Sequence, residues 1–257
     1  SGLVGSEMCI RDRQDDTDSI AAIRLAVDRG INWIDTAAVY GLGHSEEIVG
    51  RALAQMSPGE RPYVFTKCGL TWSADQRQAT PRRNGAPASI RREIEGSLRR
   101  LGVERIDLYQ MHWPAGDGTP LEAYWQELLD LKQAGKVRAV GLSNHNLAQL
   151  QDAEALGHVE SLQPPFSAIQ RSAAADLIPW CAQNGTGVIV YSPMQSGLLS
   201  GGFTAERAQA LRQDDWRSRN AEFKAPNLAR NLALAEALKP IAERHGATQA
   251  AVAIAWT

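Results

Sequence analysis

Six short apolar runs alternate along the chain with segments of helical periodicity, and this alternation limits the folds open to it. The runs, such as VRAVGLS and GVIVYS, are nearly continuous in apolar residues. Strands of this kind are buried on both faces, which is typical of a parallel sheet covered by helices. The six expected strands are residues 31–36, 63–67, 106–112, 137–143, 159–163 and 187–192.

Helical stripes occupy the intervals between these runs. The first stripe carries Ile20, Ile23 and Val27 and is followed by Gly30, a residue that commonly ends helices. A later helix is expected to begin with a capping box and an early proline at residues 119–122, and to end at Gly135. Further helices are expected through residues 47–53, along the stripe 90–101, over 230–244 and over 247–256.

Polar residues at the ends of the strands distinguish a closed barrel from an open parallel sheet. Six of them stand at or just after the ends of successive strands: Asp35, Lys67, His112, Asn144, Gln163 and Ser192. In an open sheet these ends would lie along a line of steps of about 4.8 Å, whereas a barrel brings them around one pocket. The sequence therefore predicts an α/β fold of the (β/α)8 TIM-barrel class. About six of the eight strands are visible, and one is expected to be missing at each end.

Composition limits the partners of such a protein. The 257 residues are 44% hydrophobic and 22% charged, with a net charge of -2 and no basic block, so neither nucleic acid nor an acidic membrane surface is an expected partner. No apolar run reaches the roughly 20 residues of a membrane helix, and no signal peptide opens the sequence. A small molecule is the expected ligand.

The cysteines and the first residues bear on compartment and domain organisation. Cys9, Cys68 and Cys181 are odd in number and far apart, which argues against disulfides and zinc and favours a cytoplasmic protein. The histidines show no metal-ligand spacing, so no metal is expected.

Residues 1–13 are expected to be a non-native or disordered leader, and residues 14–257 a single barrel domain truncated at both ends.

Four of the polar residues suggest a proton-transfer site. Tyr40 lies five residues after Asp35, and Lys67 and His112 end the next two strands. A neighbouring ammonium stabilises a phenolate and lowers the pKa of the phenol, which makes tyrosine a usable general acid. A carboxylate keeps the buried ammonium charged, and the imidazole can donate a hydrogen bond to a carbonyl oxygen. Together these groups can protonate an alkoxide as a hydride reaches the carbonyl carbon.

The motifs around these residues resemble those of the aldo-keto reductase family from Thr17 to Thr257. INWIDTAAVYG, HSEEIVGRAL, VFTKCG and DLYQMHWP are similar to the segments that hold the family's catalytic tetrad. The resemblance implies that Asp35, Tyr40, Lys67 and His112 are catalytic. GLSNHN and YSPMQSGLLSG are similar to cofactor-binding segments of the family. The cofactor contacts implied by the resemblance are Ser143, Asn144, Gln163, Tyr191, Ser192, Pro193, Gln195, Gly197 and Leu198.

The resemblance implies an NADP-dependent reductase of aldehydes or ketones, and DDWRSRNAEF is similar to bacterial general carbonyl reductases of the family. NAD stays possible, because the family's last strand and the basic segment that binds the adenosine phosphate are absent. The absence of both outer strands leads us to expect a chain that is unstable or inactive, since two sheet edges would be exposed. The substrate and the oligomeric state stay open.

Two other functions fit a barrel. A non-catalytic barrel of the same family could bind the cofactor as a regulatory subunit, because fold does not determine function. A glycosidase would need two facing carboxylates at strand ends, and only Asp35 occupies such a position.

Overall fold

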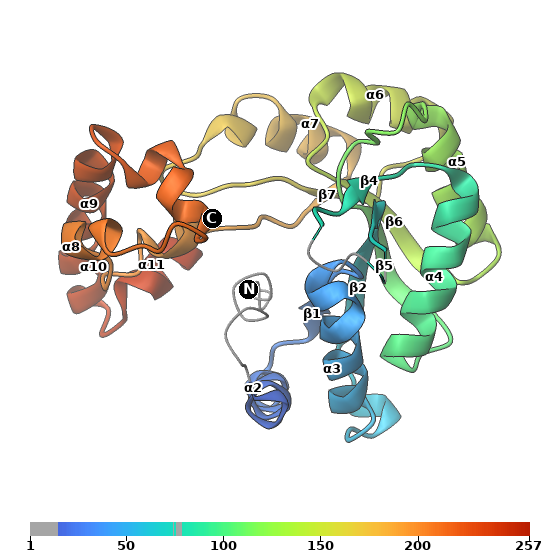
Figure 1. Cartoon of the computed structure of the whole chain (residues 1–257), viewed down its shortest axis with the longest axis horizontal. Helices are drawn as coiled ribbons and strands as arrows, with labels where there is room; N and C mark the ends of the chain where they lie inside the picture. The colour runs from blue at the N-terminus through green and yellow to red at the C-terminus, as the bar shows by residue number, and fades with distance from the viewer. Residues whose placement is uncertain (1–14, 74, 76–78) are drawn as a thin grey trace. The chain divides into compact units, whose positions relative to one another are not determined.

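The computed structural model describes residues 15–73, 75 and 79–257 (Figure 1). The expected leader, residues 1–13, lies outside the described residues. The chain divides into two compact units: the first runs to Gln163 and includes Pro179–Ile189, and the second comprises Pro164–Ile178 and Val190–Thr257. Among the described helices, none combines the length and the apolar character needed to cross a bilayer.

The first unit is built on a curled sheet of six parallel strands that forms part of a barrel wall. The strands are β1 (Trp33–Asp35), β2 (Tyr63–Cys68), β5 (Ile106–Met111), β6 (Val137–Ser143), β7 (Ser161–Gln163) and β8 (Gly187–Val188). Their order in the sheet follows their order in the sequence, as a βα barrel requires. A small antiparallel hairpin, β3 (Leu70–Thr71) with β4 (Arg82–Arg83), follows β2. The predicted six strands and the barrel fold class are confirmed.

The strand register places one set of side chains on a common face. Lys67 is opposite Gln110, Gln110 is opposite Gly141, and Gly141 is opposite Ser161. Paired residues of parallel strands point to the same side, and so do residues two positions further along a strand. The strand ends therefore carry their polar side chains on this same face.

Helices alternate with the strands and cover the other face. They are α2 (Asp16–Asp28), α3 (His44–Leu53), α4 (Pro87–Leu101), α5 (Leu121–Gln133), α6 (Leu147–Leu156) and α7 (Leu177–Asn184). In α4, Pro87 stands in the first turn, Ile90 and Ile94 are fully buried, and Gly102 ends the helix with a φ of 66°. Figure 1 shows α4 and α5 side by side on the outside of the sheet.

Three details differ from the sequence-based predictions. The predicted capping box at Thr119 is wrong: Pro120 is the N-cap, and no side chain caps α5. The strand expected over 187–192 ends at Val188, and Ser192 has a φ of 58°, which is outside the strand region. The helix expected over 230–244 is two helices, because Pro240 lacks the N–H needed to continue the first.

The second unit is helical and has its own apolar clusters. Its helices are α8 (Ala205–Gln209), α9 (Asn227–Ala237), α10 (Lys239–Arg244) and α11 (Gln249–Ala255). Leu199, Leu238 and Ala253 belong to one buried cluster, and Leu198, Phe203 and Phe223 form a second. Across both units, the described residues also form short 3-10 helices: η1 (Tyr40–Gly43), η2 (Pro58–Glu60), η4 (Ser172–Ala174), η5 (Gln195–Gly197), η6 (Trp216–Arg219) and η7 (Ala221–Phe223).

Gly141 provides a direct test of the close strand packing below the site. A Cβ at this position would lie 2.2 Å from the Ser161 hydroxyl and 2.6 Å from its carbonyl oxygen. We expect Gly141→Ala to lower the free energy of unfolding by about 1–3 kcal/mol, because the backbone of β7 would have to move. Gly59→Ala, where a Cβ would meet nothing within 4 Å, is the control. Equal urea midpoints for the two variants would contradict the packing described.

Candidate active site

A buried ion pair forms the centre of the candidate site. The Nζ atom of Lys67 lies 2.5 Å from Oδ2 of Asp35 and also donates a hydrogen bond of 2.9 Å to the carbonyl oxygen of Thr36. The side chains of Lys67 and Asp35 are 1% and 5% exposed. A buried charge is tolerated when it is paired and hydrogen-bonded, so Asp35 and Thr36 hold the ammonium in one place.

Tyr40 and His112 complete the cluster. The Nζ atom of Lys67 lies 5.5 Å from the centroid of the Tyr40 ring, and the Tyr40 and His112 rings meet edge to face with centroids 5.6 Å apart. The structure therefore brings together all four residues that the sequence predicts to be catalytic.

Tyr40 reaches this position through an unusual turn after β1. Gly41, Leu42 and Gly43 all have positive φ values, of 63°, 54° and 104°. Such a left-handed turn is easy for glycine and costly for leucine, and strain of this kind is common at functional sites. The turn follows Tyr40 directly and leads into α3, which begins at His44.

The His112 side chain is in an apolar and cationic environment. Burial, and then the charge of Lys67, lower the pKa of His112 well below its usual value of 6.5. The ring is therefore neutral near pH 7, and it can donate one hydrogen bond but cannot act as a cationic acid.

This lowered pKa makes stability sensitive to acid. Because the folded protein resists protonation of His112, the unfolded chain binds the proton first once the pH falls below about 6.5. This group alone should lower the free energy of unfolding by up to about 1.4 kcal/mol per pH unit on acidification. In urea unfolding between about pH 7 and 5, His112→Gln should show a shallower decline than the wild type. Parallel declines would contradict a depressed pKa.

Three buried polar atoms on this face have no hydrogen-bond partner among the described residues: Oδ1 of Asp35, Oε1 of Gln110 and Nδ1 of His112. An unpaired buried polar atom costs about 1–3 kcal/mol, and such atoms call for a functional explanation. Their position beside Lys67 is consistent with a site that receives a polar ligand.

The next two strand ends carry a hydroxyl and two amides. The Ser143 hydroxyl donates to the carbonyl oxygen of Gln163 at 2.9 Å, and Nδ2 of Asn144 donates to the carbonyl oxygen of His112 at 3.0 Å. Asn144 has a φ of 62°, in the left-handed region that asparagine adopts more readily than most residues other than glycine. Hydroxyl and amide side chains are the groups that pair with a carboxamide, so these residues fit the nicotinamide end of a dinucleotide.

The other expected cofactor residues, Tyr191, Ser192, Pro193, Gln195, Gly197 and Leu198, belong to the second unit. Ser192, Gln195 and Ser196 have φ values of 58°, 46° and 52°, and the Ser167 hydroxyl donates to Oε1 of Gln195 at 3.0 Å. Repeated left-handed backbone costs of order 1–3 kcal/mol per residue and is typical of ligand-binding loops. Within this loop the N–H groups of Gln195, Gly197 and Leu198 donate to backbone carbonyl oxygens of the loop itself, which holds the turns in place.

Several residues that contribute to the site were not predicted from the sequence. The Thr36 carbonyl carries no side-chain signal, because its contact comes from the backbone. Gln110 could have been found from the two-residue period of its strand, since it precedes His112 by two positions. Tyr124 and His145 are both buried beside the Ser143 segment. Nothing in their spacing predicts this contact.

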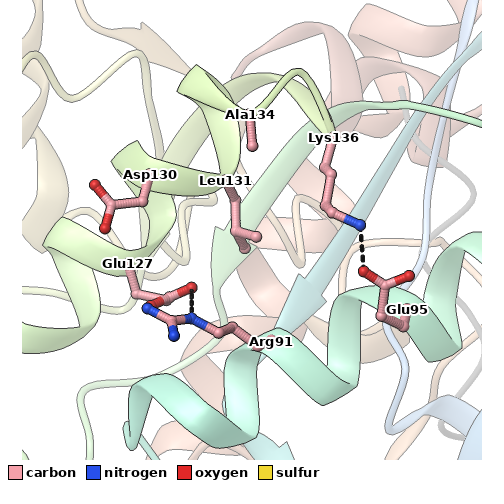
Figure 2. Close-up of a pocket in the computed structure, with 7 residues that line it drawn as sticks. All are labelled: Arg91, Glu95, Glu127, Asp130, Leu131, Ala134 and Lys136. Atoms are coloured by element: carbon pink, nitrogen blue, oxygen red, sulfur yellow. Dashed lines mark hydrogen bonds and ion pairs between the residues drawn. The ribbon is translucent and has the colours of Figure 1, made fainter.

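Two further features, possible metal ligands and the pocket in Figure 2, were compared with this site. Within the described part of the chain, no group of three or more histidine, cysteine or acidic residues could hold a metal. A pocket of about 350 Å³ lies on the outer helices, and Figure 2 shows Arg91 paired with Glu127 and Lys136 paired with Glu95 there. Lys136 precedes β6, so this pocket lies at the end of the sheet opposite Ser143.

Comparison with known proteins identifies the family. The model of the aldo/keto reductase family matches residues 4–257. Aldo-keto reductase YhdN of Bacillus subtilis is 34% identical over 94% of this chain and 71% of its own length. The NADH-specific methylglyoxal reductase of Escherichia coli is 35% identical over 88% of this chain and 71% of its own length.

Solved structures agree with this match. The glycerol dehydrogenase AKR11B4 from Gluconobacter oxydans superposes with a TM-score of 0.87 at 40% identity, covering 95% of this chain and 73% of that one. An aldo/keto reductase from Klebsiella pneumoniae, in complex with NADP and acetate, gives a TM-score of 0.65 at 26% identity, covering 99% of this chain and 74% of that one. The chain belongs to the aldo/keto reductase family.

Proposed function

We propose that this protein reduces an aldehyde or ketone to an alcohol with a reduced nicotinamide cofactor, using Tyr40 as the general acid. The observation that carries the proposal is the buried Lys67 ammonium, which pairs with Asp35 and lies 5.5 Å from the Tyr40 ring centroid. This reaction, the reduction of a small carbonyl compound, matches the family to which the chain belongs and the activity named for the Escherichia coli relative.

The cofactor, when bound, supplies the hydride that reaches the carbonyl carbon. Tyr40 gives its hydroxyl proton to the carbonyl oxygen, so that the oxygen becomes the alcohol and the tyrosine becomes a phenolate. The Lys67 ammonium stabilises that phenolate through its charge, and Asp35 keeps Lys67 charged inside the protein. The neutral His112 ring donates a hydrogen bond to the same oxygen and holds it toward Tyr40. The tyrosine regains its proton from solvent after the alcohol leaves.

We propose that Ser143, Asn144 and Gln163 hold the carboxamide, that Tyr191 stacks on the nicotinamide ring, and that the loop 192–198 covers the pyrophosphate. The buried side chains of Ser143 and Gln163, the neighbouring amide of Asn144 and the left-handed turns of this loop support these roles. The proposal treats residues 14–257 as one functional domain, which the family match over residues 4–257 supports.

NADP is the cofactor that we propose, with NAD as the second candidate. The Klebsiella pneumoniae relative is solved with NADP and with NADPH, whereas the Escherichia coli relative is named as NADH-specific. The buried free cysteines Cys68 and Cys181 are consistent with a reducing compartment, and the cytoplasm is our proposed location.

The test measures consumption of NADPH and of NADH with methylglyoxal and with a simple ketone, alongside direct binding of each cofactor. Turnover with either cofactor supports the proposal, and the ratio of the two kcat/KM values decides the cofactor. Tight binding of a cofactor without turnover would instead favour a non-catalytic regulatory barrel. The presence of all four tetrad residues argues against that role. Failure to bind either cofactor would refute the proposal.

A further inference from the structure

The His145 ring is buried between α5 and the segment that carries Ser143 and Asn144. It is 2% exposed, and so is Tyr124, which reaches it from α5. One ring nitrogen, Nδ1, lies 2.8 Å from the carbonyl oxygen of Ser143, and the other, Nε2, lies 2.8 Å from the Tyr124 hydroxyl. Both nitrogens are therefore occupied by partners inside the protein.

The chemistry of the partners determines which nitrogen carries the proton. A carbonyl oxygen can only accept, so Nδ1 of His145 must donate to Ser143. In a neutral ring Nε2 then has a lone pair, and it accepts a hydrogen bond from the Tyr124 hydroxyl. The ring is neutral near pH 7, because burial lowers the pKa of His145 to about 4.

This pair contacts a short segment that contains a residue in the left-handed conformation. Asn144 has a φ of 62°, and its Nδ2 donates to the His112 carbonyl and to the Ser143 hydroxyl, each at 3.0 Å. Two residues after Asn144, Asn146 forms a capping box with Gln149 at the start of α6. The hydrogen bond from His145 holds the Ser143 carbonyl, and the Tyr124 hydroxyl connects the His145 ring to α5.

We infer that Tyr124 and His145 are positioning residues that hold Ser143 and Asn144 in the orientation needed to bind the carboxamide of a nicotinamide cofactor. This inference rests on the proposed function. His145 bonds to the Ser143 carbonyl and to the Tyr124 hydroxyl, so the pair is connected to the site through the Ser143 carbonyl. Groups that orient binding residues in this way set affinity and selectivity.

The experiment compares cofactor binding, measured by calorimetry, in the wild type and in His145→Phe, His145→Asn and Tyr124→Phe. Phenylalanine keeps a ring but removes the donor to Ser143, so the Kd should rise about fivefold to tenfold, the effect of losing one or two buried hydrogen bonds. The amide of His145→Asn keeps a donor near the position of Nδ1, and its Kd should stay within about twofold of the wild type. Tyr124→Phe should raise the Kd by about twofold to fivefold.

A cofactor in which an acetyl group replaces the carboxamide separates positioning from general weakening. The wild type should bind the carboxamide form more tightly than the acetyl form, and His145→Phe should lose most of that preference. His158→Phe, at an exposed position, and the melting temperature of each variant without cofactor serve as controls.

The outcomes separate the inference from the function on which it rests. A wild type that binds no nicotinamide cofactor would overturn both. A wild type that binds, with His145→Phe and Tyr124→Phe binding equally well, would overturn the positioning role alone. An unchanged preference for the carboxamide form in His145→Phe would also overturn it, as would a His145→Asn variant as weak as His145→Phe.

Discussion

Replacing Tyr40 by phenylalanine is expected to lower kcat for carbonyl reduction by a factor of about 10² to 10⁴, the usual contribution of a general acid. The substitution removes only the hydroxyl and keeps the ring beside Lys67 and His112. The cofactor Kd should change by less than about twofold, because the proposed carboxamide contacts come from other strands. Steady-state kinetics combined with calorimetry check both parts.

Tyr63→Phe is a matched control, since Tyr63 is 49% exposed at the start of β2 and lies away from the tetrad. It should retain the activity of the wild type. A Tyr40→Phe enzyme that keeps more than about one tenth of wild-type kcat would show that the proton comes from another group.

Replacing Lys67 by methionine is expected to affect both stability and activity. The change leaves the Asp35 carboxylate buried without its ammonium, and breaking a buried pair in this way costs about 3–5 kcal/mol of unfolding free energy. Catalysis should be lost as well, because no cation remains to stabilise the Tyr40 phenolate. Urea unfolding and steady-state kinetics measure the two effects.

The double variant Asp35→Asn with Lys67→Met separates these effects. Removing both charges removes the penalty of an unpaired one, so most of the lost stability should return while activity stays absent. A double variant as unstable as Lys67→Met would show that the charge pair is not the cause. A double variant with restored turnover would exclude the ammonium from catalysis.

The architecture was largely predictable, because burial on both faces leaves a strong pattern. The runs that became β1, β2, β5, β6, β7 and β8 are largely apolar, and the polar residues at their ends indicate the edge at which the site lies. Element boundaries were less predictable. The φ of 58° at Ser192 and the break before Pro240 depend on backbone geometry that residue type alone does not determine.

The four tetrad residues were predictable because each lies at or near a strand end, where the fold brings them together. The residues that support them were not. Lys67 receives its second contact from the Thr36 backbone, and His145, in the loop after β6, meets Tyr124 from α5. Contacts of this kind depend on tertiary packing, which leaves no local pattern in the sequence.

The most direct test of the proposed chemistry is a crystal structure of the protein with oxidised cofactor and a carbonyl-containing inhibitor. We predict that the inhibitor's carbonyl oxygen lies within about 3 Å of both the Tyr40 hydroxyl and a His112 ring nitrogen, with Lys67 still paired to Asp35. A Tyr40 hydroxyl more than about 8 Å from the Lys67 amine, too far for a bond even through one water, would contradict the account.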